Sequence, residues 1–121
     1  MILQLLHWLG FLKLRTAVGY KGQIAFQWPA SSEADYHLLL AIEEAITTGL
    51  GPIGLVGVHD IGGGEMNVFI HTNDPTAVLG KAMSLIHGNY NGKELMVGYR
   101  KFAEDDYTPM FPPGWTAFQV S

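Results

Sequence analysis

The side chains of this chain that could do chemistry gather in residues 51–74, GPIGLVGVHDIGGGEMNVFIHTND. The imidazole, carboxamide and carboxylate groups that we consider in this stretch are those of His59, Asp60, Glu65, Asn67, His71 and Asp74. Imidazole and carboxylate groups can ligate Zn, Ni or Fe, and they can also act as general acids or bases. Their spacing matches no short catalytic or metal-binding motif, so the fold must decide which of them act together.

A β-hairpin is predicted to position these side chains. Residues 53–60 and 66–72 are rich in β-branched, aromatic or small residues, as is typical of strands. Between them, Gly62, Gly63 and Gly64 can adopt positive φ without a Cβ penalty, which suits a turn. The spacing therefore predicts two antiparallel strands joined by a glycine turn.

The register of this hairpin predicts which side chains share a face. With Ile61 opposite Glu65, the further cross-strand pairs are His59–Asn67 and Leu55–His71. Side chains alternate between the two faces, so one face is apolar and collects Val56, Val58, Met66, Val68 and Ile70. The other face is mixed and collects Leu55, His59, Glu65, Asn67, Phe69 and His71.

The elements on either side of the hairpin complete an α+β pattern. Residues 22–28 alternate as a half-buried strand that ends before Pro29, and residues 94–102 form a last strand. Ser32 and Asp35 form a capping box that predicts a helix up to Gly49, and Asp74 predicts the start of a second helix. Residues 103–121, rich in proline and aromatic residues, are expected to pack across the domain.

The element order β-α-β-β-α-β is that of a ferredoxin-like split βαβ sandwich. Right-handed crossovers give an antiparallel sheet of order 4-1-3-2 with two helices on one face. Residues 20–121 would form this single domain, including the C-terminal tail, after an apolar extension of residues 1–19. The opposite sheet face would be open and would carry the mixed hairpin set together with Gln23, Gln27, Met96 and Arg100.

The N-terminal extension is strongly apolar over residues 1–16, MILQLLHWLGFLKLRT. This run is shorter than the roughly 20 residues that span a bilayer. Its positive charges, Lys13 and Arg15, follow most of the apolar run, unlike those of a secretory signal. We expect it to pack on its own domain or on a second subunit, which favours a homodimer. A membrane-surface anchor and an upstream extension from a misplaced start codon are the alternatives.

The composition restricts the partners and the chemistry of the protein. The formal net charge is −4 over 121 residues and the sequence holds no basic cluster, which argues against a nucleic-acid partner. The sequence has no cysteine, which excludes disulfides, zinc thiolate sites and thiol chemistry. We expect a cytoplasmic protein that does not associate with membranes.

Four chemical uses of the open face compete. A metal or catalytic site of His59, Glu65 and His71 would need two histidines that are well separated along the hairpin. General acid–base chemistry would pair His59 with Glu65. Phosphate capture by the glycine turn lacks the G-x-G-x-x-G spacing and a following helix. Base stacking on Phe69 is opposed by the acidic net charge.

The pattern therefore favours a small acidic, non-enzymatic binding protein that uses the open sheet face and the Gly-rich hairpin, with no cofactor or metal. Its binding residues would be His59, Glu65, Asn67, Phe69, His71 and Arg100. The partner would be a basic protein, as for an inhibitor or an immunity-type protein, or a small ligand. The alternative is a small enzyme or a ligand- or metal-binding protein of the dimeric α+β barrel type, with His59, Glu65 and His71 in its site.

Overall fold

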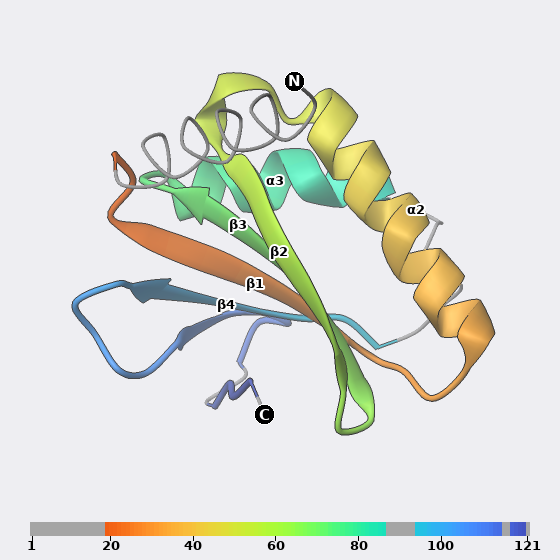
Figure 1. Cartoon of the computed structure of the whole chain (residues 1–121). Helices are drawn as coiled ribbons and strands as arrows, with labels where there is room; N and C mark the ends of the chain where they lie inside the picture. Colours follow the sequence, from red (N-terminus) through yellow and green to blue (C-terminus); the bar gives the residue numbers. More distant parts are fainter. Residues whose placement is uncertain (1–18, 87–93, 115–116, 121) are drawn as a thin grey trace, which may run out of the picture.

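The described part of the chain forms five strands and two α-helices (Figure 1). The computed structural model describes residues 19–86, 94–114 and 117–120, so the predicted N-terminal extension lies outside the described residues except for Gly19. The elements are β1 (Gly22–Pro29), α2 (Glu33–Gly49), a 3-10 turn (Gly51–Ile53), β2 (Leu55–Gly62), β3 (Glu65–Thr72), α3 (Pro75–Ile86), β4 (Met96–Lys101) and β5 (Thr108–Phe111). The predicted α+β class is confirmed, and β5 is an element that the sequence pattern did not predict.

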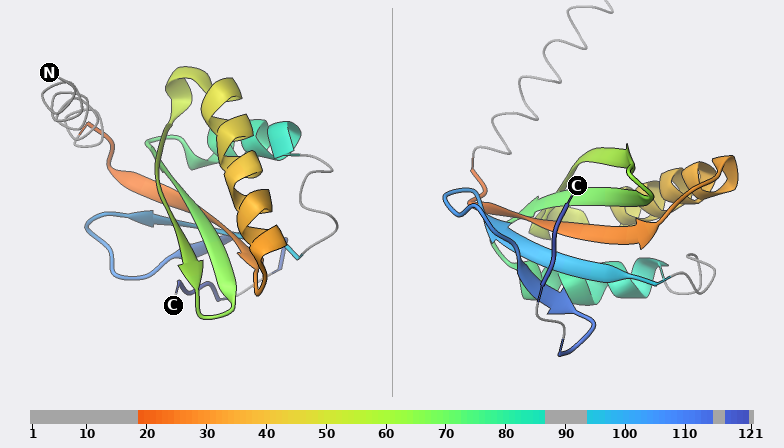
Figure 2. Two further views of the ribbon diagram at one scale, coloured as in Figure 1. Left: turned by 45° about the vertical axis from the view of Figure 1, so that its right-hand side comes forward. Right: turned by 90° about the horizontal axis from the view of Figure 1, so that it is seen from below.

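All strands belong to one antiparallel sheet of order β2-β3-β1-β4-β5. β1 is the central strand, between β3 and β4, and β2 and β5 are the two edges. Helices α2 and α3 lie on the same face of the sheet, and the C-terminal segment crosses the other face (Figure 2). The sheet thus presents one face to the helices and one face to the tail and the surface.

Both helices start as their sequences predict. The Ser32 Oγ accepts a hydrogen bond from the Asp35 N–H at 3.2 Å, while the Asp35 carboxylate accepts from the Ser32 N–H at 3.2 Å. This reciprocal capping box satisfies N–H groups that have no partner inside the helix. At α3, Asp74 Oδ1 accepts from the Ala77 N–H at 3.1 Å, and Pro75 occupies the first helical position.

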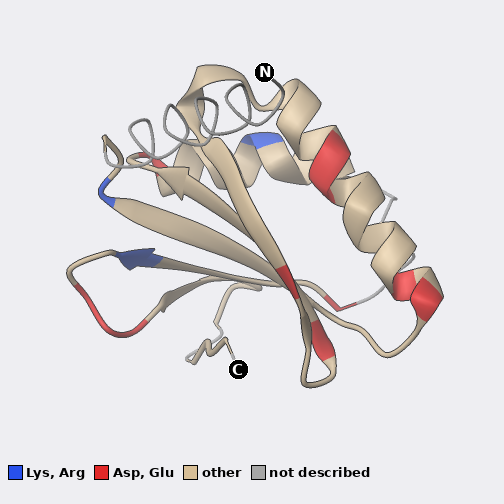
Figure 3. Ribbon diagram, viewed as in Figure 1, with Lys and Arg blue, Asp and Glu red and all other residues tan. Residues whose placement is uncertain are grey.

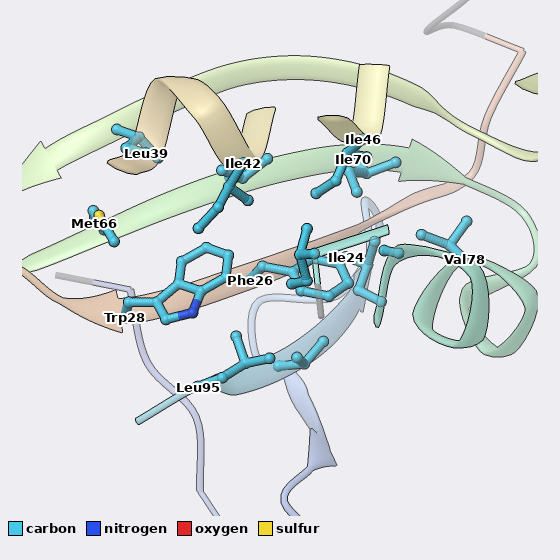
Figure 4. Close-up of a cluster of buried hydrophobic side chains, with 14 of the residues drawn as sticks. Ile24, Phe26, Trp28, Leu39, Ile42, Ile46, Met66, Ile70, Val78 and Leu95 are labelled. Carbon is cyan, nitrogen blue, oxygen red and sulfur yellow. The ribbon is translucent and has the colours of Figure 1, made fainter. Parts of the chain in front are cut away.

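The core lies between the sheet and the two helices (Figure 4). From β1, Ile24, Phe26 and Trp28 are fully buried, and their register partners on β3 and β4 face the same way. The helices contribute buried residues at helical spacing, which are Leu39, Ile42, Ile46, Val78, Ala82 and Ile86. This agrees with the apolar stripes that the sequence predicts for the two helices.

The predicted register of the β2–β3 hairpin is wrong near the turn. Leu55 pairs with His71 as predicted, but Gly62 pairs with Glu65 and His59 pairs with Val68. The turn has two residues, Gly63 and Gly64, and φ is positive at both, 62° and 83°. Two-residue turns with positive φ match the twist of the two strands that they join.

A β-bulge between Val56 and His59 accommodates the shorter turn, because two residues of β2 oppose one residue of β3 there. The bulge exchanges the faces of two neighbouring residues. His59 shares the helix side with Val68, and Val58, which was predicted to be in the core, is 69% exposed. Val68 and Ile70 are buried as predicted.

The tail covers part of the sheet face opposite the helices. The Phe118 side chain is buried and packs directly on Gly98, where an added Cβ would come within 2.6 Å of the ring. The Gln27 side chain donates to the Gln119 carbonyl at 2.9 Å. The face is therefore covered over β1 and β4 and less covered over β2 and β3.

Candidate functional site

Three of the six predicted binding residues lie half-buried on the face opposite the helices, and the buried Asn67 shares that face. Phe69 and His71 lie on β3, and Arg100 lies on β4, each half-buried. The cross-strand register places Gln23 of β1 opposite both His71 and Arg100, so the two residues are separated by one strand. The predicted grouping of these three residues on one face agrees with the structure.

Four rings and one guanidinium group form a row across this face. We call it the aromatic row, and its members are His71, Phe102, Arg100, Tyr107 and Phe118. The His71 and Phe102 rings meet edge to face with centroids 5.3 Å apart. The Arg100 guanidinium lies over both neighbours, 5.9 Å from the Phe102 centroid and 5.6 Å from that of Tyr107. The Tyr107 and Phe118 rings are 5.2 Å apart. Such edge contacts and cation–π contacts hold the side chains in fixed relative positions.

Neighbouring residues hold the members of the row in place. Gly57, in the bulge of β2, leaves room for the His71 imidazole, because a Cβ there would lie 3.3 Å from its Nε2 atom. The Arg100 guanidinium donates to the Glu104 carbonyl at 2.9 Å, and the Gln23 carboxamide donates to the Tyr107 hydroxyl at 2.6 Å. The row is thus fixed from the sheet below and from the β4–β5 loop above.

His59 does not belong to this face, so its predicted position on the open face is wrong. Its Nδ1 lies 2.8 Å from the Glu43 Oε2 on α2, and its ring meets the Tyr36 ring edge-on at 6.3 Å. The bulge in β2 turns the imidazole toward the helix, where a carboxylate meets it. A pair of this kind orients the imidazole, but the structure places it on the far side of the sheet from His71.

Glu65 and Asn67 occupy two further environments. Asn67 is fully buried beneath the tail, and its Oδ1 accepts from the Gln27 carboxamide at 3.1 Å. Glu65 is half-buried at the hairpin end, where it lines a pocket together with Glu94. Asn67 is therefore a buried residue of this face that hydrogen-bonds to Gln27. Glu65 belongs to the part of the surface at the hairpin end.

The chemical consequence is that His59, Glu65 and His71 do not converge on one site. Within the described ranges, no group of three histidine or acidic side chains is placed to hold a metal ion. The geometry of the aromatic row instead offers ring faces, ring edges and one guanidinium. These groups suit contact with another molecule's surface more than proton transfer.

Two surface residues were missed as site candidates. Val58 has the largest exposed fraction of the exposed large apolar residues in the described part of the chain, and Phe102, at 41%, is second. Phe102 was detectable, because it follows Arg100 by two positions and alternation puts it on the same face. The exposure of Val58 could not be predicted, because it results from the bulge and no local residue pattern indicates a bulge there.

Comparison with known proteins gave no relatives: no protein-family model matches the chain, and no curated protein or solved structure matches it either. In the part of the chain that the structure describes, no helix has the length and apolar character needed to cross a membrane.

Proposed function

We propose that this protein is a non-enzymatic binding protein on a ferredoxin-like scaffold. The scaffold assignment is supported by the two helices on one sheet face and by β4, β1, β3 and β2 standing next to one another in that order. A β5 strand is then an addition at the outer edge of β4.

The working surface in this proposal is the less covered half of the sheet face, which we call the β2–β3 surface: Leu55, Val58, Phe69, His71 and Phe102. The observation that carries the proposal is the exposure of Val58 (69%) and Phe102 (41%) on either side of His71. Leu55 pairs with His71, and Val58 lies in the bulge opposite Phe69, so the surface is continuous. Exposed apolar side chains gathered around a fixed polar ring are typical of a binding surface.

Charge supports a basic protein as the partner. The net charge of the chain is −4, and Asp60 is exposed on the edge strand β2, opposite Asn67 in the register. Further acidic residues lie along α2 and the hairpin (Figure 3). The acidic net charge would steer a basic partner and speed its association, and the apolar side chains of the surface would then contact it. An inhibitor or an immunity-type protein would use such a surface. A second copy of this chain is the other occupant of the surface, and we propose a homodimer for the free protein.

The enzyme alternative, a dimeric α+β barrel with His59, Glu65 and His71 in one site, loses its support because these side chains are dispersed over three environments. The proposal is tested by capture of partners from the native host at low salt with the wild-type chain and with a Val58→Ser, Phe102→Ser variant. A matched control is Leu40→Ser, since Leu40 is 36% exposed but lies on α2. A basic protein that the control retains and the double variant loses is the expected result. A partner captured equally by all three chains would contradict the proposed surface.

A further inference from the structure

The described part of the C-terminal tail, residues 117–120, lies on the sheet without being one of its strands. It crosses the face opposite the helices (Figure 2). Its side chains alternate, because Phe118 is buried and Val120 is half-buried, whereas Ala117 and Gln119 are exposed. Such alternation is typical of an extended segment that turns every second side chain toward a surface. The tail therefore lies on this face in the manner of a bound peptide.

One ring and one main-chain carbonyl hold the tail on the sheet. The Phe118 ring packs on Gly98, where a Cβ would come within 2.6 Å of it, and its centroid is 5.2 Å from that of Tyr107. The Gln119 carbonyl accepts a hydrogen bond from Gln27 Nε2 at 2.9 Å. A side chain seated against a specific position and hydrogen bonds to the main chain are the two components of extended-peptide recognition. The face under the tail provides both.

The tail is separate from the hydrophobic core of the domain. Phe118 is buried but does not belong to the core cluster, which lies on the other side of the sheet, under the helices. A pocket of about 240 Å³ runs beside the tail, and its lining residues are Asp105, Asp106, Tyr107, Phe118, Gln119 and Val120. A segment that borders an open space on one side loses packing contacts there. Displacement of the tail therefore leaves the core cluster intact.

A buried hydrogen-bond donor of this face is not satisfied by the tail. The Asn67 side chain is fully buried, and its Nδ2 donates to none of the described residues. Gln27 Nε2 donates both to Asn67 Oδ1 and to the Gln119 carbonyl, so the Asn67 carboxamide lies next to the main chain of the tail. The next residue, Val120, has an apolar side chain and offers no acceptor. An unpaired buried donor is costly, so a segment that supplied an acceptor here would fit the face better than the tail does.

We propose that the face under the tail is a peptide-binding site, the tail site, defined by Gln27, Asn67 and Gly98. Its ligand is an extended segment of a partner protein that carries an aromatic residue and, two positions later, a side chain that accepts a hydrogen bond. The aromatic ring takes the place of Phe118 on Gly98, the main chain accepts from Gln27, and the acceptor pairs with Asn67 Nδ2. The tail is the internal competitor that this segment displaces. The tail site lies beside the β2–β3 surface and does not depend on what that surface binds.

The test is an NMR titration of the full chain with three capped peptides. The asparagine peptide is Thr-Ala-Phe-Gln-Asn-Ser, the tail peptide is Thr-Ala-Phe-Gln-Val-Ser, and the alanine peptide is Thr-Ala-Ala-Gln-Asn-Ser. The asparagine peptide should shift the amides of Gln27, Asn67 and Gly98 and move those of Ala117 and Gln119 toward the positions of an unstructured chain. It should bind about fivefold more tightly than the tail peptide, because it gains one buried hydrogen bond, and the alanine peptide should not bind.

Three outcomes of this titration would overturn the proposal. The first is that the asparagine peptide leaves the tail in place. The second is that the alanine peptide displaces the tail equally well, because the ring would then not be recognised. The third is that the tail peptide binds as tightly as the asparagine peptide or more tightly, which would make the tail of a second copy the occupant of the site.

Variants of the full chain test the two recognition features separately. Gly98→Ala fills the position that receives the ring and should abolish binding of the asparagine peptide, whereas Gly80→Ala, where an added Cβ meets no atom within 4 Å, should not. Val120→Asn supplies the acceptor within the tail itself, so it should strengthen the internal competitor and weaken binding of the asparagine peptide about fivefold. Ala117→Asn places the same side chain at an exposed position and is the control. Unchanged binding in Gly98→Ala, or equal weakening by Ala117→Asn and Val120→Asn, would overturn the proposal.

Discussion

His59 on the edge strand and Glu43 on helix α2 meet across the boundary between the sheet and the helix, with the imidazole Nδ1 2.8 Å from the carboxylate Oε2. The two residues are 16 positions apart in the sequence. Their side chains are 32% and 22% exposed, so the pair is partly shielded from water. It joins the edge strand β2 to helix α2, and the Tyr36 ring lies edge-on to the imidazole.

This pair should contribute to stability. Replacing His59 with alanine is expected to lower the free energy of unfolding by about 1 kcal/mol, since a partly buried polar pair is lost. Urea unfolding of His59→Ala, Glu43→Ala and the double variant gives the coupling between them. The control is His37→Ala, because His37 forms a looser pair with Glu33 at 3.6 Å and both side chains are well exposed. Equal losses for His37→Ala and His59→Ala would show that the His59 pair adds nothing.

The bulge in β2 leads to a second prediction, which compares two valines. Val68 is fully buried and Val58 is 69% exposed. Val68→Asp places an unpaired charge in the core and should cost about 3 kcal/mol or more, enough to unfold a marginally stable domain. Val58→Asp should change stability little. Circular dichroism melting curves distinguish the two variants, and the unbulged register would require both to unfold.

The helices and the faces of three strands could be predicted from the sequence because local chemistry decides them. Ser32 with Asp35 and Asp74 with Pro75 satisfy the backbone groups at a helix start using residues within three positions. The alternation of Ile24, Phe26 and Trp28 is likewise a local pattern. The short strand β5 gave no such signal, because it has four residues and includes Pro109.

The candidate site was only partly predictable because long-range contacts set it. Alternation favours Val58 in the core and His59 at the surface, and the structure reverses this through the bulge and the Glu43 partner. Phe69, His71 and Arg100 were placed correctly, since the central strands keep a regular register. Asn67 is buried because the C-terminal tail, some fifty residues later in the sequence, crosses the sheet above it. No residue pattern near Asn67 indicates where the tail lies.

The contact between the tail and Gly98 gives a third prediction. A Cβ at position 98 would come within 2.6 Å of the Phe118 ring, so Gly98→Ala should displace the tail from the sheet face. Phe118→Ala removes a buried ring and should cost about 3 kcal/mol of stability. Amide hydrogen exchange in residues 23–27 should accelerate in both variants. Gly80→Ala is the control, because an added Cβ there meets no atom within 4 Å and alanine favours the helix. Unchanged exchange in Gly98→Ala would contradict the described tail contact.

The proposed homodimer gives a fourth prediction. The apolar residues 1–19 and the apolar side chains Leu55, Phe69 and Met96 motivate it, since such groups are costly to leave exposed. Sedimentation velocity should show a dimer for the full chain and a monomer for a chain that starts at Tyr20. A monomer in both cases would leave the apolar segment to pack on its own domain.

The two histidines of the hairpin should differ in their importance for binding. His71 lies in the β2–β3 surface against Phe102, whereas His59 faces α2. His71→Ala should therefore weaken binding of a captured partner about tenfold or more, because binding energy concentrates in a few central residues. His59→Ala should leave the affinity nearly unchanged while lowering the melting temperature. Isothermal titration of both variants against the same partner measures the affinity, and thermal melting measures the stability. Loss of affinity in His59→Ala with none in His71→Ala would move the binding surface to the helix side of the sheet.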